Sequence, residues 1–302
     1  MEKLNSLLVA SDLSPRAAYA LARALRLAQE QQARLHVLHV VADVVNADNW
    51  PRLAFGAPGA VERELAQEAE AALRAQLAAH PAARVHAEPH VRIGTPHFDI
   101  LAQARAHSAD LIVLGAHGGH YLKEWLLGTT AERVIRSGDR PVLVVKKTPR
   151  APYRRVVAAV DFSDTSRAAL QRAAQLAPHA AFTVLHAYHL WYEARLRAGG
   201  MSSDAIQELY REHEQDVRGK LEAFVRDAGL DAAKATLVAQ RGYPPTVIMH
   251  EVSARRADLV AVGTQGMSAV RRMLLGSVAE HVLREARADV LTVPPRAETQ
   301  PS

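Results

Sequence analysis

Hydrophobic residues along this chain fall into two kinds of segment. Short runs rich in Val, Leu and Ile alternate with longer stretches in which apolar residues recur at helical spacing. In the first half, the short runs predict five strands, at residues 6–10, 35–41, 84–93, 110–114 and 141–145. A helix is predicted at 15–32, with Ser14 as N-cap and Pro15 as its first residue. Strands that alternate with helices and lack a polar face predict a parallel sheet covered on both faces.

The second half of the chain repeats the first. Residues 109–145 recur at 257–293 with a constant offset of 148, and 15 of the 37 aligned positions are identical. Segments 7–12 and 94–96 also match 156–161 and 242–244. The sequence therefore predicts two tandem doubly wound domains, each an α/β fold with a five-stranded parallel sheet. Their expected bounds are 1–148 and 153–295, with a proline-punctuated linker between them and a tail at 296–302.

One local difference between the halves is expected after the second strand. Residues 190–226 are charged, have helical spacing and are interrupted only at Gly199 and Gly200, so they predict a longer helical crossover. The corresponding residues 43–58 of the first half are expected to form a loop.

Composition and charge exclude several classes of protein. The 302 residues include no cysteine, which excludes disulfide scaffolds, thiolate metal sites and cysteine nucleophiles. The net charge of +5 is shared between the halves, with 17 basic and 15 acidic residues in 1–148 and 20 and 17 in 149–302. Interspersed charges of this kind give little support for nucleic-acid binding. Because no apolar run is long enough for a signal peptide or a membrane span, a cytoplasmic location is expected.

Candidate chemistry lies at the carboxyl ends of the predicted strands, where doubly wound sheets bind ligands. Asp12 and Asp161 follow the first strand of each half. A glycine span follows each fourth strand, and the two spans read Gly115-x2-Gly118-x9-Gly128-Thr129-Thr130 and Gly263-x2-Gly266-x9-Gly276-Ser277-Val278. The glycines let the backbone approach a ligand, and helices predicted at 129–137 and 277–286 offer free N–H groups to a phosphate. With an aspartate that accepts hydrogen bonds from ribose hydroxyls, the pattern favours a nucleotide.

The duplicated glycine spans, the aspartates and the closing Pro-Val-Leu-Val-Val resemble the universal stress protein family in its tandem form. The resemblance implies an adenine nucleotide alpha-hydrolase-like, Rossmann-like fold and ATP binding without a well-defined enzymatic reaction. It also implies two sets of site residues. The first set is Ala10, Ser11, Asp12, Val40 near the adenine, Gly115, His117, Gly118, Gly128, Thr129 and Thr130. The second is Ala159, Val160, Asp161, Ala187, Gly263, Gln265, Gly266, Gly276, Ser277 and Val278.

These features predict a cytoplasmic ATP-binding stress or regulatory protein, with two competent sites and little or no hydrolysis. Arg271 and Arg272 replace Lys123 and Glu124, so the second site offers more positive charge to a polyphosphate. One alternative is a nucleotide-dependent hydrolase or transferase in which Asp12 or Asp161 holds magnesium. Another is a nucleotide-free protein-interaction module. Standard enzyme motifs are missing from the sequence, and no catalytic residue is assigned.

Other polar residues have structural interpretations. Asp12 and Asp161 can serve as turn or capping residues, and His39 and His186 are expected to pack beside the sheet. His117 and His120 lack further matched ligands, so no protein-held metal is predicted, although Mg²⁺ can accompany the nucleotide phosphates. Three arginines of the first helix are expected to be solvated: Arg16, Arg23 and Arg26.

Assembly of the two domains is also predicted. The resemblance implies pairing through the fifth strands, so 141–145 is expected to lie antiparallel to 289–293 within the chain. That pairing would cover an apolar edge strand. The sequence leaves open whether two chains pair as a homodimer.

Overall fold

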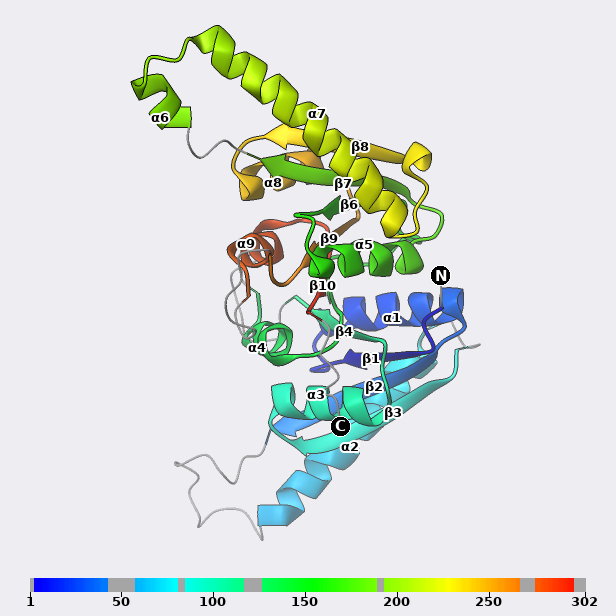
Figure 1. Cartoon of the computed structure of the whole chain (residues 1–302). Coiled ribbons are helices and arrows are strands. Elements are labelled where there is room, and N and C mark those ends of the chain that lie inside the picture. Colours follow the sequence, from blue (N-terminus) through cyan, green and yellow to red (C-terminus); the bar gives the residue numbers. More distant parts are fainter. Residues whose placement is uncertain are drawn as a thin grey trace, which may run out of the picture. The chain divides into compact units, whose positions relative to one another are not determined.

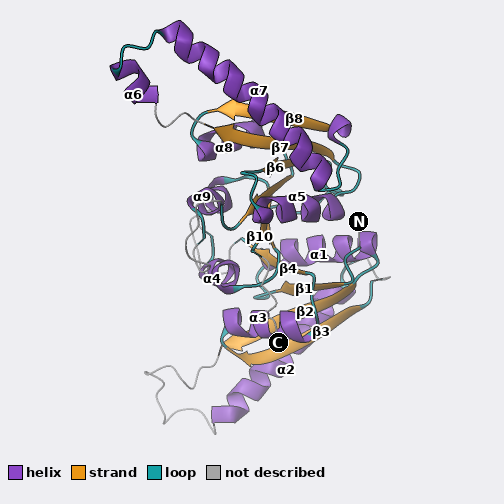
Figure 2. Cartoon of the chain, viewed as in Figure 1, coloured by secondary structure: helices purple, strands orange, loops and turns teal. Residues whose placement is uncertain are grey.

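The chain divides into two compact units, residues 2–152 and 153–302. The computed structural model describes residues 3–42, 58–80, 85–116, 127–188, 193–266 and 275–295. In each unit, helices lie on the faces of a twisted sheet (Figures 1 and 2). Within the described ranges, each helix is too short or too polar to cross a lipid bilayer.

The first unit contains five parallel strands in the order β3-β2-β1-β4-β5. Its helices connect consecutive strands, which is the doubly wound arrangement that the sequence predicts. The elements are β1 (Ser6–Ala10), α1 (Ala17–Gln31), β2 (Arg34–Ala42), α2 (Pro58–Ala78), β3 (Ala87–Gly94), α3 (Pro96–Ala106), β4 (Leu111–Gly115), α4 (Thr129–Ser137) and β5 (Val142–Val145).

The second unit repeats this topology, with parallel strands in the order β8-β7-β6-β9-β10. The predicted fold class, two tandem five-stranded α/β domains, is confirmed. The elements are β6 (Arg155–Ala159), α5 (Asp164–Leu176), β7 (Ala181–Tyr188), α6 (Glu193–Ala198), α7 (Ser203–Asp227), a 3₁₀ turn η1 (Ala232–Lys234), β8 (Ala235–Arg241), α8 (Pro244–Ala254), β9 (Leu259–Gly263), α9 (Ser277–Glu285) and β10 (Asp289–Val293).

The central strands are almost fully buried because helices cover both faces of each sheet. Leu7, Leu8 and Val9 of β1 have no exposed surface, and Leu111 and Ile112 of β4 have none either. Strands buried on both faces need continuous apolar runs, which explains why their positions could be predicted to within a few residues.

A duplicated aspartate ties the first strand of each unit to the fourth. The Asp110 carboxylate accepts hydrogen bonds from the backbone N–H groups of Asn5 and Ser6, at 2.7 and 3.1 Å. The Asp258 carboxylate accepts the equivalent bonds from Arg154 and Arg155, at 2.9 and 3.0 Å. These carboxylates satisfy backbone donors at the start of β1 and β6, so their recurrence in the repeat has a structural reason.

The predicted start of the first helix is wrong by two residues. Leu13 adopts a left-handed conformation, with φ of 62°, and the chain turns before α1 begins at Ala17. Ser14 lies in this turn, where its N–H donates to Asp12 Oδ1 and its hydroxyl accepts from the Ala17 N–H. Arg16, which has no side-chain cap bond, takes the N-cap position.

The prediction that the α1 arginines are solvated is wrong for Arg23. This side chain is buried, with 6% of its surface exposed, and its guanidinium donates to the Ala151 carbonyl oxygen at 3.0 Å. Arg26 is half-buried, whereas Arg16 is exposed. The reason is that Arg23 lies on the face of α1 that also carries buried Ala20 and Leu27.

Candidate functional site

A cavity of about 700 Å³ lies at the carboxyl edge of the sheet in the second unit. It is bounded by the ends of three strands, β6, β7 and β9, and by the first residues of α8 and α9. All ten residues that the sequence assigns to the second site line this cavity: Ala159, Val160, Asp161, Ala187, Gly263, Gln265, Gly266, Gly276, Ser277 and Val278.

Sequence reasoning missed several other residues that line the cavity. Apart from His186, they are hydroxyl-bearing or apolar residues from the same strand ends and from α5, α8 and α9: Ser166, Leu185, His186, Pro244, Ile248, Val262, Thr264, Leu275 and Ala279. A signal was present for Pro244, because 242–244 matches 94–96 in the repeat. Leu275 and Ala279 also recur in the repeat, as Leu127 and Ala131. Ser166 and Ile248 carry no such signal, and only the folded chain brings them to the cavity.

Asp161 is held in a fixed orientation just after β6. The Ser163 N–H and hydroxyl donate to its Oδ1, at 3.1 and 2.5 Å. On the other side, a Cβ atom added to Gly266 would lie 2.6 Å from Asp161 Oδ2. Glycine at position 266 therefore lets the backbone lie against this carboxylate.

The turn after β6 is bonded to the turn after β9. The Thr165 hydroxyl donates to the Gln265 carbonyl oxygen. A Cβ atom on Gly263 would lie 2.7 Å from Thr165 Oγ1 and 3.0 Å from the Ser166 backbone nitrogen. Position 263 must therefore be glycine for the two turns to meet.

The N-terminus of α9 forms one wall of the cavity. Gly276 is its N-cap, with an extended backbone, and its N–H donates to the Thr264 carbonyl oxygen at 2.8 Å. Ser277, Val278 and Ala279 form the first turn and line the cavity. The first-turn N–H groups have no partner within a helix, and the helix dipole is positive at this end, so the wall favours an anion.

His186 is a packed residue of the cavity wall. Its Nδ1 donates to the Val160 carbonyl oxygen at 2.8 Å, and its ring lies 4.4 Å from that of Phe162. Burial lowers the pKa of His186, whereas the hydrogen bond to Val160 and the charge of Asp161 oppose that shift. His39 of the first unit makes the same bond, from its Nδ1 to the Ser11 carbonyl oxygen, also at 2.8 Å. In both units, the histidine therefore joins the ends of the first two strands.

In the first unit, the corresponding positions also lie at the carboxyl edge. Ala10 and Gly115 end β1 and β4, Val40 lies near the end of β2, and Ser11 and Asp12 follow β1. Gly128 is the N-cap of α4, which opens with Thr129 and Thr130, and the Gly128 N–H donates to the Ala116 carbonyl oxygen at 2.8 Å. The remaining predicted residues of the spans lie outside the described residues: His117, Gly118, His120, Lys123, Glu124, Arg271 and Arg272.

Comparison with known protein families gives two matches. Residues 4–146 and 152–294 each match the model of the universal stress protein family. Universal stress protein YxiE of Bacillus subtilis (strain 168) is 33% identical over 146 residues, which cover 47% of this chain and 99% of that protein. Universal stress protein MJ0531 of Methanocaldococcus jannaschii is 31% identical over 143 residues, 47% of this chain and 82% of that protein. Each relative therefore aligns with about half of this chain.

Solved structures that cover almost the whole chain share its fold. The crystal structure of a universal stress protein from Archaeoglobus fulgidus DSM 4304 has a TM-score of 0.63 at 19% identity, and covers 97% of this chain and 99% of that one. A functionally unknown protein from Pseudomonas aeruginosa PAO1 has a TM-score of 0.62 at 22% identity, and covers 97% and 93%.

Proposed function

The chain belongs to the universal stress protein family, and on that basis we propose that it binds ATP in the cavity of its second unit. One observation carries the proposal: the cavity is bounded both by Asp161 and by the glycine span that leads into α9. Its volume of about 700 Å³ lies within the range of small-molecule sites, roughly 300–1,000 Å³.

The chemistry of the walls supports a particular orientation of the nucleotide. The phosphates lie against the N-terminus of α9, where Ser277 adds a hydroxyl donor to the backbone N–H groups. The ribose hydroxyls donate to the Asp161 carboxylate, and the adenine lies toward Ala187 at the end of β7. Mg²⁺ bound with the phosphates would neutralise part of their charge, held by water and the Ser277 hydroxyl.

We propose further that nucleotide occupancy, and not turnover, is what a protein partner reads in the cytoplasm during stress. Among the described lining residues, the titratable side chains are Asp161 and His186. The His186 Nδ1 proton is engaged by Val160, and Ser163 donates twice to Asp161. Neither group is set up as a base that positions water, so hydrolysis is slow.

A phosphate-release assay with and without Mg²⁺ tests this part of the proposal. We expect much less than one turnover per second. Turnover of many per second would instead support the nucleotide-dependent hydrolase or transferase.

Calorimetric titration with ATP tests the binding site. We expect Gly266→Ala to lower the stoichiometry by one ATP per chain, because the added Cβ displaces the Asp161 carboxylate. Gly219→Ala is the matched control, because Gly219 lies exposed on α7 and a Cβ there meets no atom within 4 Å. Unchanged ATP binding by Gly266→Ala would contradict the site and favour a nucleotide-free interaction module.

The equivalent edge of the first unit is proposed as a second ATP site, built on Asp12, Gly115, Gly128 and Thr129. The parent protein should then bind close to two ATP per chain, with different affinities. A stoichiometry clearly below one would contradict both sites.

A further inference from the structure

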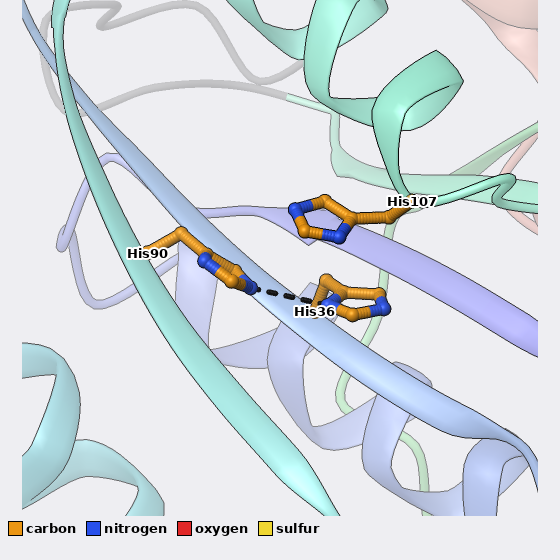
Figure 3. Close-up of side chains that lie close together, drawn as sticks. All are labelled: His36, His90 and His107. Atoms are coloured by element: carbon orange, nitrogen blue, oxygen red, sulfur yellow. Dashed lines mark hydrogen bonds between the residues drawn. The ribbon is translucent and has the colours of Figure 1, made fainter.

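Three histidines meet at the opposite edge of the first unit, near the amino ends of the strands. His36 is the third residue of β2, His90 is the fourth residue of β3, and His107 follows the last residue of α3. Figure 3 shows the three rings close together, with the ring of His107 above that of His36. The cluster is separate from the carboxyl edge and does not depend on the proposed nucleotide site.

The fold brings these residues together through strand register and helix packing. In the parallel pairing of β2 with β3, His36 lies beside Glu88, and His90 lies two residues further along the same face. Helix α3 packs over β2 and β3, so its carboxyl end places His107 above them. The Ser6 hydroxyl donates to the His107 carbonyl oxygen at 2.9 Å and fixes that end.

The distances within the cluster are those of a nearly assembled metal site. One ring nitrogen of each histidine lies within 4.8 Å of the other two. His36 Nδ1 is 3.1 Å from His90 Nε2, and Glu88 Oε2 is 3.5 and 3.9 Å from these two nitrogens. In a tetrahedral site with bonds of roughly 2.0–2.1 Å, two ligand atoms lie about 3.3–3.4 Å apart.

His107 needs the largest adjustment. Its ring stacks on that of His36, with centroids 4.0 Å apart and 17° between the planes. This half-buried side chain lies at the end of a helix. A rotation of its ring would aim one ring nitrogen at the point between His36 Nδ1, His90 Nε2 and Glu88 Oε2.

The surroundings of three of these side chains change their pKa values. Burial and the neighbouring His107 lower the pKa of His36 to about 4, and the same two causes lower that of His90. The pKa of Glu88 is lowered as well, chiefly by the hydrogen bond that its Oε1 receives from His86 Nε2 at 2.8 Å. Near neutral pH, His36 and His90 are therefore uncharged imidazoles and Glu88 is an ionised carboxylate.

We propose that His36, His90, His107 and Glu88 form a zinc-binding site. Three imidazole nitrogens and one carboxylate oxygen make a tetrahedral donor set that suits Zn²⁺, whereas Ca²⁺ and Mg²⁺ prefer oxygen ligands. His86 orients the carboxylate from outside, as partners of metal ligands commonly do. The bound ion joins β2, β3 and the end of α3.

The second unit shows that the fold does not need this cluster. The same register positions there carry Thr183, Thr236 and Val238, and Arg255 stands where the repeat aligns His107. Both units nevertheless have five parallel strands in the same order. Packing or topology alone therefore does not account for three histidines at these positions.

Zinc binding by the full chain, free of any affinity tag and stripped by a chelator, tests the proposal. After dialysis against Zn²⁺, we expect one tightly held zinc per chain, and X-ray absorption with three imidazole ligands and one oxygen at about 2.0–2.1 Å. His36→Thr, His90→Val and Glu88→Gln should each weaken binding by about tenfold or more.

Two control variants separate this cluster from other histidines. His250→Gln changes an exposed side chain of the second unit, and a double variant combines His117→Gln with His120→Gln. Both should keep the parent affinity. Because 42% of the Glu88 side chain is exposed, compared with 7% for His36, Glu88→Gln should fold even if a histidine variant does not. Parent-like zinc affinity in Glu88→Gln, or loss of zinc in the double variant of His117 and His120, would overturn the proposal.

Discussion

The two units are alike at the carboxyl edge of the sheet and different at the amino edge. At the carboxyl edge, both carry an aspartate after the first strand, a glycine N-cap before a helix and a histidine bonded to the end of the first strand. At the amino edge, the positions held by His36, Glu88 and His90 in the first unit are held by Thr183, Thr236 and Val238 in the second. A duplicated fold thus retains the residues that its backbone requires and leaves other edge positions free to acquire different chemistry.

The described residues of the two carboxyl edges also differ just after the first strand. In the second unit, Thr165 donates to the Gln265 carbonyl oxygen and Asp161 is half-buried. The repeat places Arg16 at the position of Thr165, and Asp12 is exposed. We therefore expect the second site to be the more rigid one and to bind ATP more tightly, because less ordering is needed on binding.

The largest expected difference between the units is their response to zinc. With free zinc at 100 times its Kd, the first unit should gain about 2.7 kcal/mol of stability. Hydrogen exchange, which reports on each unit separately, should show slower exchange in β2 and β3 after zinc is added and no change in β7 and β8. If zinc slowed exchange equally in β2 and β3 and in β7 and β8, the two amino edges would not differ in zinc binding.

The next prediction concerns a feature that the units share. Asp110→Ala and Asp258→Ala each leave two backbone N–H groups without their carboxylate, so each should destabilise its own unit by about 1–3 kcal/mol. Urea unfolding measures the loss of stability in each variant, and hydrogen exchange shows which unit is affected. A large effect in one unit and none in the other would show that the repeated aspartate does not have the same role twice.

A smaller effect is expected from Thr165→Ala. Loss of the bond to Gln265 should weaken ATP binding at the second site by about 1 kcal/mol, or roughly fivefold. The measurement is hydrogen exchange at the N-terminus of α9, which ATP should slow less in Thr165→Ala than in the parent protein. Arg16→Ala, the matched change in the first unit, should leave that protection unchanged.

The smallest effect is a pH dependence at His186. Because burial holds its folded-state pKa below the ordinary 6.5, the unfolded chain binds the proton first as the pH falls. The stabilisation by neutral His186 is complete above about pH 6.5 and is lost as the pH falls through the lower folded value. His186→Gln should therefore cost stability at pH 7.5 and less at pH 5.5, as measured by urea midpoints. If His186→Gln loses the same stability at both pH values, then the titration of His186 does not contribute to the pH dependence.

The strands and the carboxyl-edge site could be predicted because their signals are local or repeated. A buried parallel strand requires an apolar run, and the glycine span of the second unit identified positions that the structure brings to one cavity. The first helix was placed two residues early, since a left-handed Leu13 and the bonds of Ser14 are properties of one turn and not of helix propensity.

The histidine cluster could not be predicted for a different reason. His36 and His90 are 54 residues apart, and no spacing motif links them. They meet only because β3 pairs with β2 in one particular register, which places His90 beside Leu38. A shift of one residue would turn His90 to the other face of the sheet, so side-chain chemistry here depends on a register that the sequence does not display.

Helix α3 extends from one edge of the first unit to the other. It spans eleven residues, or about 16 Å, from Pro96 at the carboxyl edge to the turn that carries His107. In the second unit, Pro244 and Ile248 of the equivalent helix line the cavity. Thermodynamic linkage then sets a strict condition: if zinc at one end of α3 changes nucleotide affinity at the other by some factor, the nucleotide changes zinc affinity by the same factor.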